Sequence, residues 1–534
     1  MTSAIAPKPL RELLQSDEPH ALLDVREQGE YNAAHIAGAC WLPRRLIETG
    51  ARALVPFSGT RTVVCDDDGA RAELAAATLE RMGYADVAML DGGLNRWTTD
   101  GLSTEWGLNV PSKEFGERLF EQDGVPEVTP DQLHAWLTGG EELVLLDART
   151  PEEHAASTIP TSRSLPGGEL ALRAAGLSLG GRTRVVVHCA GRTRSIVGAR
   201  TLQRMGVPNV YALRNGTMGW SMAGYELETG STRTAMPHPA ENEDAARRAR
   251  ALADEDGVRS LSPGGLAELM ATSGTQNVYL IDPRTREEYA AGHVPGFRWF
   301  PGGQAVQRAD EVMAVRHGHV VFACDGIIRA AVTASWFAQM GFSNVSMLDG
   351  GTTAWAAAGR ALETGFASPA PDGLAQAQAE LSAVSPVELR DALASSQPPT
   401  VLFVGTSRDF SAAHTPGARW LARGWLEIRV AGLVESRSTP VVTTCSEGVQ
   451  SSLAAATLRE LGYERVSVLD GGLAAWRAAG LPTEGGLAGV ASPPQDVVPT
   501  GTARTPAEMM HYLRWEEALG DKYKAGHRPG TTDT

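Results

Sequence analysis

The chain has 534 residues, of which 43% are hydrophobic and 21% charged, and a net charge of −15, an ordinary composition for a water-soluble globular protein. The negative charge and the lack of a basic patch argue against nucleic-acid binding. No run of about 18 apolar residues could cross a bilayer, and the N-terminal sequence lacks the apolar stretch of a signal peptide. We therefore expect a cytoplasmic protein that binds neither nucleic acid nor membrane.

Cysteines are few, and three of the five recur at a regular place. Cys189, Cys324 and Cys445 each lie 31 residues before a tryptophan, and a fourth copy has Asp66 at the same distance before Trp97. One cysteine per copy argues against a disulfide framework, and no CxxC or Cys/His cluster predicts a metal site. We expect no metal and no cofactor, and interpret the regular cysteines as nucleophiles.

The tryptophan ends a phrase that occurs four times: LDGGLNRW at 90–97, LRNGTMGW at 213–220, LDGGTTAW at 348–355 and LDGGLAAW at 469–476. The four marked positions are separated by 123, 135 and 121 residues, which is the size of a small domain. We therefore predict four tandem domains and a C-terminal tail, with the bounds 8–106, 126–228, 258–364, 381–485 and 486–534.

The same order of elements is predicted in each domain. A short first helix opens with a Ser/Thr-Pro pair in the later three domains, at 129–130, 262–263 and 385–386. A first strand follows at 21–26, 143–149, 278–284 and 401–404. A second strand leads into the marked position, at 62–64, 184–188, 319–323 and 440–444. An alanine-rich helix, a third strand and the GG–Trp helix complete the domain. This alternation predicts an α/β fold, each domain a small parallel sheet with helices on both faces.

Composition also marks linkers and a tail. The expected linkers are 107–125, the charged stretch 241–257 and 366–380. The tail is rich in proline at 486–500, and TPAE at 505–508 is a capping box that predicts a helix to about residue 519. We expect this helix to dock on the body through Met509, Leu513 and Trp515.

Reactive chemistry is predicted between the second strand and the alanine-rich helix. The four loops there are DDDGAR at 66–71, CAGRTR at 189–194, CDGIIR at 324–329 and CSEGVQ at 445–450. A cysteine at this point faces backbone N–H groups and the positive end of a helix. Both lower the pKa of a thiol and stabilise an anion on sulfur.

Together these motifs resemble the rhodanese (sulfurtransferase) family. The resemblance covers all four domains. It consists of the six-residue loop, the LDGG–Trp phrase, Asp-x-Arg pairs at 24/26, 147/149 and 282/284, and the phrases HIAGA at 35–39, HVPG at 293–296 and HTPGA at 414–418. It implies four tandem rhodanese-like domains with thiosulfate sulfurtransferase activity. A cysteine would take a sulfane sulfur from thiosulfate or a similar donor, become a persulfide, and pass the sulfur to cyanide, a small thiol or a protein thiol.

The four loops are not equivalent. The loop of Cys189 matches the family best, so we predict Cys189 as the main nucleophile, with Cys324 and Cys445 as further candidates. Asp66 and the two aspartates after it would repel thiosulfate, so the first domain is expected to be inactive. Cys65 stands one residue early, on the other face of its strand.

The predicted substrate-binding residues follow from the same loop. Arg192 and Arg194 supply two guanidinium groups that suit a dianionic donor. The full set is Ala190, Gly191, Arg192, Thr193, Arg194, Ser195, Arg149 and Arg329.

Other repeated residues are expected to have structural roles. The histidines of the three His phrases are expected to make structural hydrogen bonds, and Thr158 stands at their place in the second domain. The Asp-x-Arg pairs are expected to orient the loop, the tryptophans to lie in the core, and Cys40 to be a buried small residue.

Three alternative functions fit parts of the pattern. A phosphatase of this fold needs Cys-x5-Arg, whereas Cys189 and Arg194 form Cys-x4-Arg, which argues against it. A 3-mercaptopyruvate sulfurtransferase remains open, and so does a largely non-catalytic scaffold of rhodanese-like domains. Formation of thiocyanate from thiosulfate and cyanide separates the scaffold from the enzyme.

Overall fold

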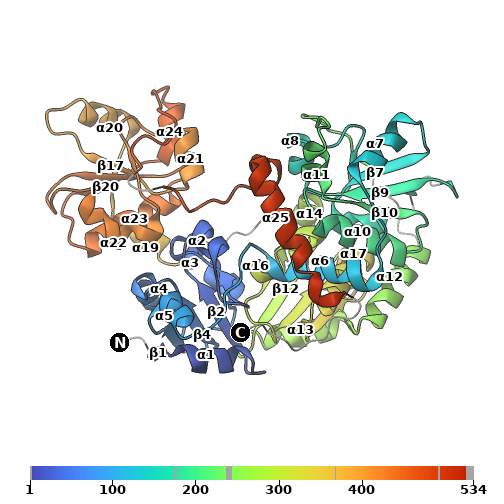
Figure 1. The fold of residues 1–534 in the computed structure, drawn as a ribbon. Coiled ribbons are helices and arrows are strands. Elements are labelled where there is room, and N and C mark those ends of the chain that lie inside the picture. The colour runs from blue at the N-terminus through green and yellow to red at the C-terminus, as the bar shows by residue number, and fades with distance from the viewer. Residues whose placement is uncertain are drawn as a thin grey trace. The chain divides into compact units, whose positions relative to one another are not determined.

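The computed structural model describes residues 3–173, 176–177, 180–235, 243–366, 369–490 and 493–524. It contains four five-stranded sheets, which confirms the predicted class of four α/β domains (Figure 1). Every sheet has the same strand order, in which the first strand of the domain lies at one edge, next to the fifth, and the third lies at the other edge. Strands that pair within a sheet run parallel.

The first domain and the segment after it contain β1 (Ser3–Ile5), α1 (Pro7–Leu14), β2 (His20–Asp24), α2 (Gln28–Ala33), β3 (Cys40–Trp41), α3 (Ile47–Leu54), β4 (Arg61–Cys65), α4 (Ala70–Arg81), β5 (Val87–Leu90), α5 (Gly93–Thr99) and α6 (Val110–Asp123). The second domain and the segment after it contain β6 (Glu127–Val128), α7 (Pro130–Thr138), β7 (Leu143–Asp147), α8 (Pro151–Ala156), β8 (Arg163–Ser164), α9 (Leu170–Arg173), β9 (Arg184–His188), α10 (Thr193–Arg204), β10 (Val210–Leu213), α11 (Gly216–Met222) and α12 (Glu243–Glu255).

The third domain and the segment after it contain β11 (Arg259–Leu261), α13 (Pro263–Ala271), β12 (Val278–Asp282), α14 (Arg286–Ala291), β13 (Arg298–Trp299), α15 (Gly302–Gln307), α16 (Ala309–Val312), β14 (His319–Phe322), α17 (Ile328–Gln339), β15 (Val345–Leu348), α18 (Gly351–Ala357) and α19 (Leu374–Glu380). The fourth domain and the tail contain β16 (Ser382–Val384), α20 (Pro386–Leu393), β17 (Thr400–Phe403), α21 (Ser407–Ala412), β18 (Arg419–Trp420), α22 (Leu426–Arg429), β19 (Val441–Thr444), α23 (Val449–Glu460), β20 (Val466–Leu469), α24 (Gly472–Ala478) and α25 (Pro506–Ala518).

Two of the five strands in each sheet were not predicted. They are the edge strands, of which β1 has three residues and β3 two. So short a strand shows no alternation of apolar and polar residues, and only its pairing with a longer neighbour defines it.

Both faces of each sheet are buried, as the fourth domain shows. Val401 and Phe403 pack into one core cluster with α20, α21 and α24. Leu402 packs into another cluster with α22 and α23. Successive side chains of a strand thus point into two different cores, one on each face of the sheet. Because both faces are buried, nearly every residue of the strand is apolar.

The repeated tryptophans lie in the cores, as predicted. Trp97, Trp220, Trp355 and Trp476 are all buried. Each donates its indole N–H to the backbone carbonyl six residues further along. This hydrogen bond fixes the segment that follows the GG–Trp helix against the domain.

Segments expected to be linkers contain helices. These are α6, α12 and α19, and each buries apolar side chains, among them Phe115, Leu252 and Leu374. In the sequence, charged or small residues outnumber the few apolar residues that form a narrow apolar face on each helix. This face is therefore recognised only from the neighbouring surface against which it packs.

By its contacts the chain forms two compact units. Residues 1–108 and 367–498 form the first unit, which holds the first and fourth domains. Residues 109–366 and 499–534 form the second unit, which holds the second and third domains and α25.

The tail helix is present as predicted. Thr505 caps α25 through a capping box, and Met509 and Leu513 are buried. Trp515 is only half-buried, and Tyr512, which was not predicted, is buried with them.

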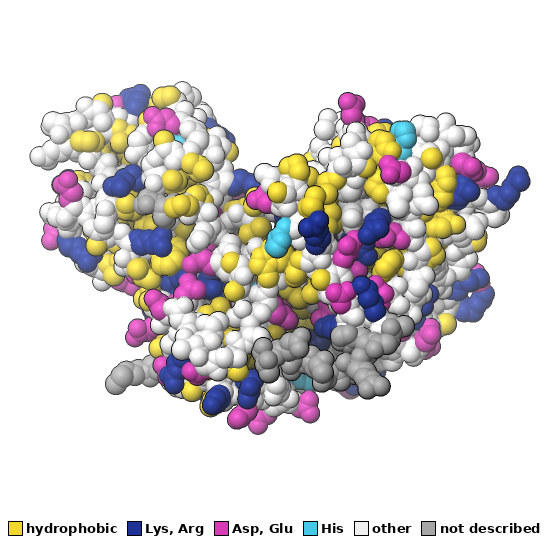
Figure 2. All heavy atoms as spheres, viewed as in Figure 1, with side chains coloured by type: hydrophobic (Ala, Val, Ile, Leu, Met, Phe, Trp, Pro, Cys, Tyr) yellow, Lys and Arg dark blue, Asp and Glu magenta, His cyan; other side chains and the backbone are white. Residues whose placement is uncertain are grey.

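Within the described ranges, no helix is both long and apolar enough to span a bilayer. On the face drawn in Figure 2, cationic and anionic side chains are interspersed among the coloured residues, without an extended field of Lys and Arg.

Candidate active site

Each cysteine loop is anchored at its first residue by the GG–Trp helix. The carbonyl of Cys189 accepts a hydrogen bond from Thr217 N–H at 2.8 Å, and the carbonyl of Cys324 accepts one from Thr352 N–H at 2.8 Å. Asp66 and Cys445 are held in the same way, by Leu94 N–H and Leu473 N–H. This contact explains the fixed distance between cysteine and tryptophan.

The fourth residue of each phrase is a glycine, and it has a role that the sequence did not reveal. Gly93, Gly216, Gly351 and Gly472 have φ values between 52° and 58°, and a Cβ at any of them would overlap a carbonyl oxygen of the adjacent cysteine or aspartate loop. The recurrence of GG or NG was visible in the sequence, but its partner was not.

The loop of the second domain begins at Cys189, directly after β9, and leads into α10. The Cys189 side chain is buried, with 2% exposure, and its Sγ lies 3.6 Å from Ser195 Oγ. Gly191 and Thr193 are also buried, and Ala190 is half-buried. Of the predicted residues, Ser195 thus contacts the sulfur, and the substrate-binding roles of the others stay predictions.

The guanidinium group of Arg192 is hydrogen-bonded to glutamate side chains. Glu117 of α6 binds it through two hydrogen bonds, at 2.6 and 2.9 Å. Glu127 lies 2.9 Å from it, and Glu517 of α25 lies 3.5 Å from it. Burial raises the pKa of Glu117 to about 7, although its hydrogen bonds with Arg192 act in the opposite direction.

Arg194 is also paired, with Glu153 at the start of α8, through hydrogen bonds of 2.7 and 2.8 Å. The same loop position is paired in the first and third domains, where Arg71 binds Glu30 and Arg329 binds Glu288. The partner is the third helical residue of a capping box in each case. The capping box was readable from the sequence, but its pairing with the loop was not.

Arg329 has a further partner across a domain boundary. Its Nη1 lies 2.9 Å from Glu169 of the second domain, so the loop of Cys324 is tied to that domain. Asp325 also pairs with Arg329, at 2.7 Å.

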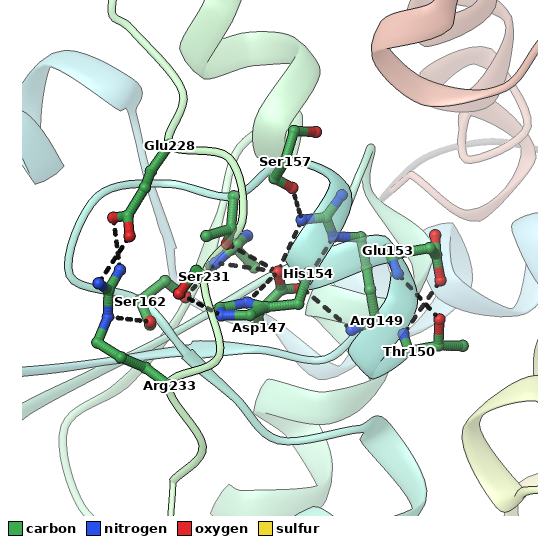
Figure 3. Close-up of polar contacts among 12 residues, drawn as sticks. Asp147, Arg149, Thr150, Glu153, His154, Ser157, Ser162, Glu228, Ser231 and Arg233 are labelled. Atoms are coloured by element: carbon green, nitrogen blue, oxygen red, sulfur yellow. Dashed lines mark hydrogen bonds and ion pairs between the residues drawn. The ribbon is translucent and has the colours of Figure 1, made fainter.

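The Asp-x-Arg pairs form a buried frame below the loops. In the second domain Arg149 donates to both carboxylate oxygens of Asp147 and to the carbonyl of Ser157 (Figure 3). Arg26 and Arg284 make the same contacts. Arg149 also lines a cavity of about 620 Å³ between the second and third domains. The pairs are thus buried and hydrogen-bonded within their domains, and their role in orienting the loops stays a prediction.

In the second domain a different histidine completes this frame. His154 Nδ1 lies 3.0 Å from Asp147, and its Nε2 lies 3.1 Å from Ser231 Oγ (Figure 3). Burial alone would raise the pKa of Asp147, but His188, His154 and Arg149 hold it well below its ordinary value.

The three histidines that were predicted from the sequence have the expected structural hydrogen bonds. The Nδ1 atoms of His35, His293 and His414 bond to the carbonyl of the residue four positions earlier. Thr158 stands in their place in the second domain and donates to Asp147 at 2.9 Å.

Cys324 lies in surroundings that disfavour its thiolate. Burial raises its pKa to about 12, with a further contribution from the negative charge of Asp325, although Arg329 and the amides of Ala330 and Gly326 act against the shift. The loop amides thus lower the pKa of this thiol, as expected, but burial outweighs them.

Cys445 shows the expected contact between sulfur and backbone. Gly448 N–H and Ser451 N–H donate to its Sγ, at 3.1 and 3.4 Å. Unlike the loop of Cys189, this loop is open, because Glu447 is exposed and Ser446, Gly448 and Val449 are only half-buried.

In the first domain a carboxylate fills the loop. Asp66 accepts hydrogen bonds from Gly69 N–H at 2.6 Å and from Arg71 N–H at 2.8 Å. The backbone of this loop therefore binds an anion in the place where the other loops hold sulfur. Cys65 is buried in the core cluster on one face of the sheet, and Cys40 is buried too, as expected.

A family model for the rhodanese-like domain matches residues 6–100, 129–223, 262–358 and 385–479. The chain belongs to the rhodanese-like domain family. Among the residues that the structure describes, no group of three or more His, Cys, Asp or Glu side chains is placed to hold a metal ion.

Proteins similar to this rhodanese-like chain include several described as sulfurtransferases. A crystal structure of a thiosulfate sulfurtransferase from Pseudomonas aeruginosa is 39% identical, covers 97% of both chains and has a TM-score of 0.89. A probable adenylyltransferase/sulfurtransferase of Mycobacterium tuberculosis is 36% identical over 96 residues, 18% of this chain and 24% of that protein. A putative thiosulfate sulfurtransferase of the same organism is 29% identical over 195 residues, 30% of this chain and 68% of that protein. The chain thus spans about a quarter of the length of the adenylyltransferase/sulfurtransferase.

Proposed function

We propose that the chain is a thiosulfate sulfurtransferase, which moves a sulfane sulfur from thiosulfate or a similar donor to cyanide, a small thiol or a protein thiol through a cysteine persulfide. The reaction class, sulfur transfer, is supported by the family and by the relatives described as sulfurtransferases. The choice of thiosulfate is supported by the description of the Pseudomonas aeruginosa protein, which is similar over almost the whole chain.

The observation that carries the proposal is the anion site formed by the loop backbone. Two N–H groups donate to the sulfur of Cys445, and two donate at short distance to the carboxylate of Asp66 at the equivalent place. A preformed ring of N–H groups of this kind stabilises negative charge on a persulfide without reorganisation during the reaction.

Cys189 is proposed as the main nucleophile. It stands at the equivalent place, at the end of β9 and before a twelve-residue helix. Ala190, Gly191, Thr193 and Ser195 would form the wall around the transferred sulfur. Arg192 and Arg194 would provide the positive charge of the loop, and each is also paired with glutamate side chains. Arg149 and Arg329 would support the loops from below.

The proposed reaction has two displacement steps. The cysteine thiolate attacks the outer sulfur of thiosulfate, the bond between the two thiosulfate sulfurs breaks, and its electron pair leaves with sulfite. The acceptor then attacks the outer sulfur of the persulfide, and the cysteine leaves as thiolate. With cyanide as acceptor the product is thiocyanate, and the overall kinetics are ping-pong.

Serine variants of the three loop cysteines test the proposal. The protein is incubated with thiosulfate, the cysteine that carries an added sulfur atom is mapped by peptide mass spectrometry, and thiocyanate production is measured. We expect Cys189→Ser to remove most of the turnover, and Cys324→Ser and Cys445→Ser to cost less. Cys40→Ala, outside every loop, is the control. Full turnover in Cys189→Ser, with the added sulfur on Cys445, would overturn the assignment to Cys189, and the absence of sulfur on any cysteine would overturn the proposed reaction.

The same assay with 3-mercaptopyruvate in place of thiosulfate distinguishes the two donors. A higher kcat/KM with 3-mercaptopyruvate would contradict the proposed donor and leave the persulfide mechanism in place.

A further inference from the structure

The C-terminal helix α25 covers the loop of Cys189. Glu516 lies on the buried side of α25 and is fully buried. Its Oε1 accepts a hydrogen bond from the Thr193 hydroxyl at 2.6 Å and from the Thr193 N–H at 3.3 Å. Lys113 of α6 lies 3.8 Å from the same oxygen. A residue far away in the sequence therefore enters the candidate active site.

Glu516 occupies an anion position. Thr193 is the first residue of α10, where N–H groups and the helix dipole favour negative charge. A Cβ on Gly191 would lie 3.1 Å from Glu516 Oε2, so the second carboxylate oxygen faces the loop two residues after Cys189. This is the region in which the negative oxygens of a bound thiosulfate would need partners.

The second oxygen of Glu516 is not satisfied. Within the described residues, Oε2 is buried and has no hydrogen-bond partner. A buried carboxylate oxygen without a donor is unfavourable, which lowers the cost of displacing Glu516 from the loop.

One of the nearby cations, Arg192, is already paired with carboxylates. Arg192 is bound by Glu117 and Glu127, and Glu517, the neighbour of Glu516 on α25, lies 3.5 Å from it. With α25 in place, Glu516 and Glu517 thus bring two carboxylates to the basic loop, where Lys113 and the arginines balance part of their charge.

We propose that Glu516 determines donor specificity at Cys189: its carboxylate takes up the N–H and hydroxyl donors of Thr193 beside the loop, so an anionic donor that needs these donors binds productively only by displacing it. The inference rests on the proposed function in treating Cys189 as the nucleophile. An intramolecular competitor of this kind raises the apparent KM for an anionic donor and leaves kcat unchanged, because the fraction of competent enzyme limits binding.

Two alkylating probes that differ in charge test this directly. Iodoacetate is anionic and iodoacetamide is neutral, and they are similar in size. In a Cys324→Ser/Cys445→Ser protein, the ratio of their rates at Cys189 is measured by peptide mass spectrometry. We expect Glu516→Gln to raise the ratio of iodoacetate to iodoacetamide rates about tenfold, because a carboxylate that faces the Cys189 loop repels only the anionic probe. Glu516→Asp, which keeps the charge, should stay near the parent value.

The matched control is Glu226→Gln, which removes the same charge from an exposed residue of the second domain. An unchanged ratio in Glu516→Gln would overturn the inference. If Glu516→Gln fails to fold, Glu516→Met in the full chain, which removes the charge at similar size, is measured instead, with the same two outcomes.

Thiosulfate kinetics separate this inference from the proposed function. We expect Glu516→Gln to lower the KM for thiosulfate with kcat nearly unchanged, whereas a fall in kcat would contradict the inference. If the alkylation ratio rises but thiosulfate leaves no sulfur on Cys189 in any variant, the proposed reaction at Cys189 is wrong and the charge selection by Glu516 stands.

Discussion

Gly216 packs directly on Cys189, and a Cβ at residue 216 would overlap the Cys189 carbonyl oxygen. The amide that follows, Thr217 N–H, donates to that same oxygen. The position of the nucleophile thus depends on a glycine at the start of the helix that carries the repeated tryptophan.

Gly216→Ala tests this contact. We expect it to destabilise the second unit and to reduce Cys189-dependent turnover, because the loop backbone must move away from the added methyl group. Overpacking of this kind costs about 1–3 kcal/mol. Gly224→Ala is the matched control, since Gly224 also has a positive φ but a Cβ added to it would meet no atom within 4 Å. Equal losses of melting temperature in both variants would contradict a specific role for the contact with Cys189.

Asp66→Ala should leave turnover nearly unchanged, because the first domain has a carboxylate where a nucleophile would stand. A loss greater than about tenfold in kcat, or about 1.4 kcal/mol of barrier, would count against this. The variant should still lower the melting temperature, since the Gly69 and Arg71 amides lose their acceptor, at a cost of about 1–3 kcal/mol. Asp68→Ala, whose side chain bonds only an exposed amide, should have a smaller effect.

Cys324 should resist alkylation at mildly alkaline pH. With a pKa raised to about 12, only about one Cys324 side chain in ten thousand is a thiolate at pH 8, and the rate should rise about tenfold per pH unit below that pKa. Asp325→Asn should increase the rate, because the negative charge of Asp325 contributes to the raised pKa. Isotope-coded iodoacetamide labelling, with Cys445 as the internal reference, measures the effect. Equal labelling of Cys324 and Cys445 at pH 8 would show that Cys324 is not protected.

Removal of residues 500–534 should lower the melting temperature of the second unit. The truncation exposes the surface covered by Met509, Tyr512 and Leu513, and each large apolar side chain contributes about 1.5–3 kcal/mol when fully buried. A shorter deletion, of residues 525–534, removes none of these side chains and is the control. An unchanged melting temperature after the longer deletion would show that α25 does not stabilise the body.

Local patterns were sufficient to predict the repeating architecture. The distance from each marked position to its tryptophan, the Ser/Thr-Pro helix starts and the capping box at Thr505 are each set by contacts within one domain or one helix turn. Such contacts recur at fixed sequence spacing, so the four domains, the cysteine loops and α25 could be recognised from the amino-acid sequence alone.

The charge state of the loops was decided by tertiary structure alone. Arg192 and Arg194 stand in a basic sequence, yet both are paired with glutamates, and the carboxylate next to Cys189 comes from Glu516, in a separate helix. Likewise Cys324 shares its loop position with Cys445, but burial and Asp325 raise its pKa to about 12. Electrostatic energy depends on distance and burial in space, and neither is encoded in the spacing of residues along the chain.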